Sequence, residues 1–97
     1  GVMRLLSLIA LLWAAPALSA PALEGQVNIN QAGVASLSLL PGVGPKRAEA
    51  IIRLRQKRPF RRAIQLRRVR GIGRRTLLKM LPYVRVDGVT DLRVRRP

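Results

Sequence analysis

The segment LLPGVGPKRAEAII (residues 39–52) sets Gly42 and Gly44 on either side of a single valine and follows them at once with Pro45. Glycine ends a helix well because the left-handed backbone conformation costs it little, and proline suits the first turn of the next helix. Apolar residues at helical spacing continue beyond the proline. The segment therefore predicts a helix, a tight turn and a second helix.

The same pattern returns 29 residues later in the chain. LSLLPGVGPKRAEAII (37–52) aligns with LRRVRGIGRRTLLKML (66–81), and Gly71 and Gly73 then take the places of Gly42 and Gly44. The apolar spacing agrees throughout, which indicates a duplicated unit. We predict an all-α fold with helices near 34–40, 45–57, 62–69 and 74–81.

The apolar stripes of these helices are expected to form the core. Pro59 should end the second helix near residue 57 or 58, because proline cannot continue it, and Phe60 can then pack back onto the core. The stripes after the two turns consist of Ile51, Ile52, Leu77, Leu78 and Leu81.

Composition argues against an enzyme. The 97 residues suit one small domain, and the chain has no cysteine or histidine and only four acidic residues, Glu24, Glu49, Asp87 and Asp91. We therefore expect no catalytic residue, no metal site and no cofactor. Nineteen Lys and Arg residues give a net charge of +15, and the segment 42–81 holds fourteen of them against a single acid, Glu49. Such a charge favours a polyanionic partner.

The N-terminal segment 1–20 is typical of a secretory signal peptide. Met3 and Arg4 precede the apolar run LLSLIALLWAA (5–15), and small residues follow in PALSAPA (16–22). The run is shorter than the roughly 20 apolar residues that a membrane-spanning helix needs. We predict a periplasmic or secreted chain that keeps no stable membrane span after cleavage.

Four segments together resemble the ComEA family, the exported DNA receptors of natural transformation. They are VNINQA (27–32), LPGVGPKRAEAII (40–52), RPF (58–60) and VRGIGRRTLLKMLPYV (69–84). The resemblance implies a tandem helix-hairpin-helix domain of two pseudo-symmetric units over residues 27–86. It also implies binding of double-stranded DNA, with the competence or uptake machinery as a further partner.

The turns themselves offer a physical reason for DNA binding. The first N–H groups of a helix have no partner inside it, and glycine lets a phosphate approach the backbone closely. Basic side chains beside each turn would add charge, so that two turns could grip the two strands without reading bases. The candidate DNA-binding residues are Gly42, Val43, Gly44, Lys46, Arg47, Gly71, Ile72, Gly73, Arg74 and Arg75.

The arginines away from the turns are interpreted as outer-rim or solvated charges that steer the ligand. They are Arg53, Arg55, Arg67 and Arg68.

Some features depart from the family pattern. Gly33 and Arg62 stand where a side chain would usually cap the first and third helices, and each missing cap costs about 1 kcal/mol. Residues 87–97 form a basic C-terminal tail. In the segment VRVDGVTDLRVRRP (84–97) the valines around Asp87 and Gly88 would suit a weak β-hairpin; disorder with additional basic contacts is the alternative.

Other functions fit the sequence less well than DNA binding. The tandem fold also resembles the extrinsic photosystem II subunit family, so a structural protein-docking subunit is the alternative function. A membrane-active basic peptide is disfavoured because the repeat specifies a compact fold. GVGPKR lacks the spacing of a phosphate-binding P-loop, and single-strand binding by base stacking is disfavoured because Phe60 and Tyr83 are expected to serve the fold.

Overall fold

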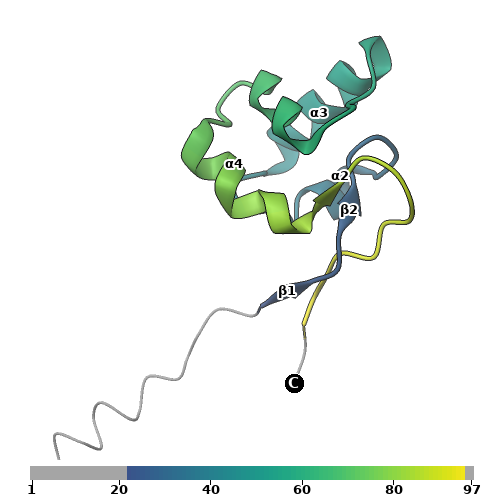
Figure 1. Ribbon diagram of the computed structural model, residues 1–97, viewed down its shortest axis with the longest axis vertical. Helices are drawn as coiled ribbons and strands as arrows, with labels where there is room; N and C mark the ends of the chain where they lie inside the picture. The colour runs from purple at the N-terminus through teal and green to yellow at the C-terminus, as the bar shows by residue number, and fades with distance from the viewer. Residues whose placement is uncertain (1–21, 96–97) are drawn as a thin grey trace, which may run out of the picture.

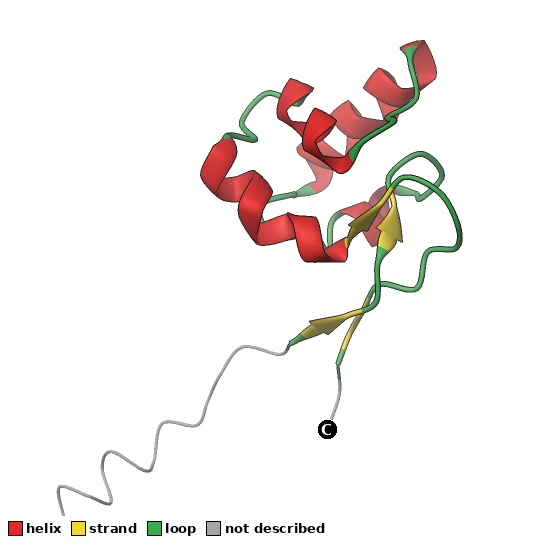
Figure 2. Cartoon of the chain, viewed as in Figure 1, coloured by secondary structure: helices red, strands yellow, loops and turns green. Residues whose placement is uncertain are grey.

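The computed structural model describes residues 22–95, so the predicted signal peptide lies outside the described residues. Three α-helices and two short 3-10 helices make up most of the regular structure in this part, and Figures 1 and 2 show their arrangement. They are α2 (Val34–Leu37), α3 (Pro45–Lys57), η1 (Ala63–Arg68), α4 (Arg74–Met80) and η2 (Leu81–Tyr83).

The helix bounds follow local signals in the sequence. Pro45 opens α3, and Arg58 after its last residue is extended, as a residue before a proline should be. The predicted range 45–57 is therefore confirmed. α4 continues directly into η2, of which Pro82 is the second residue.

Two of the predicted helices differ from the structure. α2 covers only Val34–Leu37, because the N–H groups of Leu39 and Leu40 bond three residues back and tighten the chain. The third helix is a 3-10 helix rather than an α-helix. No side chain caps it at Arg62, but the Oε1 of Gln65 accepts from the backbone N–H of Arg61 at 2.7 Å and so satisfies one donor at its start.

Four two-residue strands show that the fold is helical but not all-α. β2 (Val27–Asn28) pairs in parallel with β3 (Val84–Arg85), and β1 (Leu23–Glu24) pairs antiparallel with β4 (Arg93–Val94). In Figure 1 the C-terminal arm, in yellow, runs back beside β1 and β2. The weak β-hairpin considered for the tail does not form, because these backbone groups pair with the N-terminal segment instead.

The core joins equivalent positions of the two units. Both members of five residue pairs that lie 29 positions apart are buried. Phe60 is 2% exposed and packs into the core as predicted. The pairs are Leu37 with Leu66, Leu40 with Val69, Val43 with Ile72, Ala48 with Leu77, and Ile51 with Met80.

Leu78 is the prediction for the core that is wrong. It is 58% exposed and occupies the position that Glu49 holds in the first unit, which is also exposed. An α-helix has 3.6 residues per turn, so each residue is rotated by about 100° from the one before it. Because Leu77 lies on the face of α4 that packs on the core, Leu78 is turned toward solvent.

Two asparagines tie the units to both ends of the domain. Asn30 donates through Nδ2 to the carbonyls of Phe60 and Val86, at 2.8 Å each, and its Oδ1 accepts from the Phe60 N–H at 2.8 Å. Asn28 is buried and donates through Nδ2 to the carbonyl of Gly88 at 2.8 Å. These hydrogen bonds replace the ones that the asparagine side chains would make to water. The two amides therefore fix the positions of the chain segments that they join, and no polar group of theirs is left unpaired.

Candidate nucleic-acid interface

The two Gly-x-Gly turns have the same backbone geometry. Gly42 and Gly71 are left-handed, with φ of 81° and 95°. Gly44 and Gly73 are extended, with φ of −94° and −89°, and each forms the N-cap of the helix that follows. The first glycine of each turn therefore needs glycine's backbone freedom, whereas the second does not.

The residue between the two glycines belongs to the core. Val43 and Ile72 are buried, and their backbone N–H groups donate to the carbonyls of Leu40 and Val69 at 3.0 and 3.1 Å. Neither side chain nor N–H group is left for a ligand. Val43 and Ile72 hold the turns in shape, and their role as DNA contacts stays a prediction.

The helix starts after the turns are open to solvent. The first bonds inside α3 and α4 are donated by Ala48 to Gly44 and by Leu77 to Gly73, at 2.9 Å each, so the preceding N–H groups lack an intrahelical acceptor. A Cβ atom at Gly44 or Gly73 would meet nothing within 4 Å. Space for a ligand therefore exists at the second glycine of each turn.

Three of the predicted basic contacts are exposed beside the turns. Lys46 follows the first turn, and Arg74 and Arg75 follow the second. Among the described residues, their side chains take part in no recorded hydrogen bond or ion pair. A hollow of about 350 Å³ beside Lys46 is lined by Gly44, Pro45, Lys46 and Arg47. These three cations are free to meet an anion.

Arg47, the fourth of the predicted basic contacts, is held in place by the turns. Its Nη1 donates to the carbonyl of Gly42 at 2.7 Å. Its guanidinium also lies against the second turn, since a Cβ atom at Gly71 would come within 2.5 to 2.8 Å of the Nη2, Nε and Cζ atoms. Arg47 therefore bridges the two turns.

Thr76 makes the reciprocal contact. A Cβ atom at Gly42 would lie 2.5 Å from the Cγ2 atom of Thr76. Positions 47 and 76 are equivalent in the repeat, as are positions 42 and 71, so each unit packs its helix start on the other unit's turn. Sequence reasoning missed the role of Thr76, although its place opposite Arg47 in the alignment was the available signal.

Two of the arginines predicted to be solvated are structural. Arg55 donates to the carbonyls of Ile29 and Ala32 at 3.2 and 2.6 Å, and burial lowers the pKa of this guanidinium below its ordinary value. Arg68 lies over the Phe60 ring, 4.6 Å from its centroid. Arg53 and Arg67 are exposed, as predicted.

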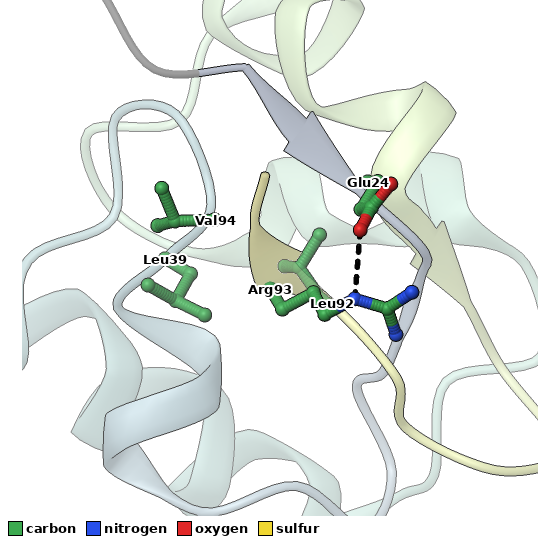
Figure 3. A pocket seen from close by; sticks show the side chains of 5 residues that line it. All are labelled: Glu24, Leu39, Leu92, Arg93 and Val94. Carbon is green, nitrogen blue, oxygen red and sulfur yellow. Dashed lines mark hydrogen bonds and ion pairs between the residues drawn. The ribbon is translucent and has the colours of Figure 1, made fainter. Parts of the chain in front are cut away.

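A hollow between the β1–β4 pair and the segment after α2 is larger but chemically different. It measures about 570 Å³, and Figure 3 shows Leu39 and Val94 on one side and the ion pair between Glu24 and Arg93 on the other. The Arg93 Nε and Glu24 Oε1 atoms are 2.8 Å apart. Because its arginine is already paired, this hollow offers an anion less than the turns do.

No group of three or more acidic, histidine or cysteine side chains gathers into a metal-binding cluster within residues 22–95. Nor is any helix in that part of the chain both long and apolar enough to cross a bilayer.

Comparison with known families agrees with this architecture. Residues 24–85 match the helix-hairpin-helix motif family, a span that includes both turns and the strands β2 and β3. No match to the chain was found among curated proteins. The match covers more than half of the sequence, and the chain belongs to the helix-hairpin-helix family.

Proposed function

We propose that this protein binds double-stranded DNA through the phosphate backbone, without reading base sequence, by means of its two Gly-x-Gly turns. Gly44 and Gly73 let a phosphate approach the helix starts, and Lys46, Arg74 and Arg75 supply the positive charge. Membership of the helix-hairpin-helix family suggests nucleic-acid binding and so supports the proposal.

The reciprocal packing of the two turns is the observation that best supports the proposal. Arg47 rests on Gly71 and Thr76 rests on Gly42, so the two open helix starts are held at a fixed separation. Two anion-binding points at a fixed distance suit a duplex, in which the phosphates of the two strands are themselves held apart. A flexible single strand gains less from such a spacing. The tandem arrangement is thus the basis of the preference for duplex DNA that we propose.

We further propose that the protein is exported and acts in DNA uptake during natural transformation, alongside the uptake machinery. The signal-like segment 1–20 and the resemblance to the ComEA family support this role. A periplasmic or secreted location would put the basic turns where incoming DNA is met.

The experiment that tests DNA binding compares charge at the turns with charge elsewhere. Replacing Lys46, Arg74 and Arg75 by Gln removes three exposed charges at the turns. The matched control replaces Arg61, Arg62 and Arg67, which are exposed, lie away from the turns and have no recorded side-chain partner. Both variants lose the same total charge.

The unchanged protein should bind unrelated duplexes with equal affinity. If it contacts four to six phosphates, the plot of log affinity against log salt should have a slope of about −4 to −5. The turn variant should reduce that slope by about 2.7, at about 0.9 per lost phosphate contact. Its affinity should fall by roughly 10²-fold, from about 1 kcal/mol per contact, against a few-fold for the control.

Equal losses in the two variants would show that net charge alone accounts for binding. A protein-docking function would then be the better explanation. A strong preference for one base sequence would also contradict the proposal, because contacts to phosphates do not read bases.

A further inference from the structure

A second basic hollow lies between α3 and the chain that carries η1 into the second turn. It measures about 240 Å³. Three of its lining residues are apolar, four are basic and none is acidic. They are Ala50, Leu54 and Val69, together with Arg53, Lys57, Arg68 and Arg70.

The charges around this hollow attract an anion. Arg53, Lys57 and Arg70 are exposed, and within residues 22–95 their side chains take part in no recorded hydrogen bond or ion pair. Like charges gathered around one hollow repel each other, and a bound anion relieves that repulsion. Arg70 directly precedes Gly71, so the hollow adjoins the second Gly-x-Gly turn.

Arg68 gives the hollow a flat, fixed surface. Its guanidinium lies over the Phe60 ring at 4.6 Å, and its Nη2 donates to the carbonyl of Arg58 at 3.3 Å. Phe60, which is itself buried, covers one face of the guanidinium, and Arg68 is also one of the residues that line the hollow. Nucleobases stack on arginine planes as they do on aromatic rings.

The volume and the lining residues of the hollow limit the kinds of ligand that it can bind. Whole small-molecule sites measure roughly 300 to 1,000 Å³, so this smaller hollow suits a single ring. A phosphate chain alone would leave the apolar surface of Ala50 and Leu54 uncovered. A ring with a negative group attached would use both the apolar floor and the basic rim.

We propose that this hollow binds one unpaired nucleotide of a strand that continues from the duplex held at the second turn. The base lies on the Arg68 guanidinium over the apolar floor, and its phosphate lies among Arg53, Lys57 and Arg70. This inference rests on the proposed function. The hollow would let the protein recognise DNA ends and gaps, while the two turns bind the duplex.

The test measures affinity for a short blunt duplex and for the same duplex with a single-stranded adenine overhang. In the unchanged protein the overhang should tighten binding about five- to tenfold, the lower end of what stacking of one base contributes. The variant R53Q/K57Q should lose most of that advantage while its affinity for the blunt duplex changes only a few-fold. R62Q/R67Q removes the same charge away from the hollow and should keep the advantage.

Arg68→Lys distinguishes stacking on the flat guanidinium from attraction by its positive charge. Lysine keeps the positive charge but has no flat face, so the overhang should again lose its advantage while the helical circular dichroism is retained. Equal affinity of the unchanged protein for blunt and overhanging duplexes would overturn the proposal, as would an advantage that survives both variants of the hollow.

A second measurement tests the nucleotide site independently of duplex binding. Backbone amide shifts are recorded by NMR while a single-stranded adenine oligonucleotide is added to the full chain. Shifts at Ala50, Leu54 and Arg68 are expected even if the blunt duplex fails to bind, in which case the proposed function fails on its own. Absence of these shifts, or their appearance only with an acidic peptide that carries an aromatic residue, would overturn the nucleotide site.

Discussion

The two glycines of one turn should respond differently to the same substitution. Gly42→Ala puts a Cβ atom on a left-handed residue with φ of 81°, which costs about 1 to 2 kcal/mol. The same atom would lie 2.5 Å from the Cγ2 atom of Thr76, and such overpacking costs about 1 to 3 kcal/mol. The free energy of unfolding should therefore fall by about 2 to 5 kcal/mol, a large part of the total stability of a domain this small.

Gly44→Ala is the matched control for stability. Gly44 has φ of −94° and no atom within 4 Å of its Cβ position. Alanine is a poorer N-cap than glycine but loses less backbone entropy on folding, and the two effects nearly cancel. The free energy of unfolding should stay within about 0.5 kcal/mol, while duplex affinity falls several-fold because the added methyl stands where the phosphate would approach.

Urea unfolding followed by circular dichroism gives the stabilities, and fluorescence anisotropy gives the affinities. The double variant Gly42→Ala/Thr76→Ser removes the Cγ2 atom, so it should recover about 1 to 3 kcal/mol and leave only the cost of the left-handed conformation. Equal stability of Gly42→Ala and Gly44→Ala would refute the reasoning about the packed turn. Full duplex affinity in Gly44→Ala would refute the approach of a phosphate at this glycine.

Two further expectations concern the surface and the N-terminus. Leu78→Gln should change the free energy of unfolding by no more than about 0.5 kcal/mol because the side chain is exposed, whereas Leu77→Ala should lower it by about 2 to 5 kcal/mol; thermal or urea unfolding of both variants checks this. The proposed export predicts that protein recovered outside the cytoplasm lacks residues 1 to about 20 and hence Trp13, which intact mass spectrometry measures. A recovered chain that retains Trp13 would indicate that the segment is an anchor.

Local chemistry made much of the fold predictable. The bounds of α3 follow from Pro45 at its start and Pro59 beyond its end, because proline acts through its own ring and its immediate neighbours. The duplication allowed the core positions of one unit to be checked against the other. Leu78 continues the apolar stripe in the sequence, but its equivalent in the first unit is Glu49, and both side chains are exposed.

What the sequence did not predict depends on contacts between distant segments. The formation of β3 and β4 requires the backbone of residues 23–28 as a partner, which no local pattern reveals. The same holds for the site. Exposure of Lys46 and Arg75 follows from helix periodicity, but the placement of Arg47 on Gly71 arises from the packing of one unit against the other.

The pairing of the two ends has a consequence for the order in which the domain is completed. Asn28 donates its backbone N–H to the hydroxyl of Thr90 at 2.9 Å and its side-chain amide to Gly88, and the carbonyl of Gln26 accepts from the N–H of Asp91 at 2.9 Å. A ribosome adds these partners well after Asn28, so β1 and the buried amide of Asn28 stay unsatisfied while the helices between them are already synthesised. Closure of the domain therefore waits until residues 88–91 have been made. A polypeptide that crosses a membrane before it folds would stay unfolded longer with such a delay. The pairing of its two ends can form only when both are on the same side of the membrane.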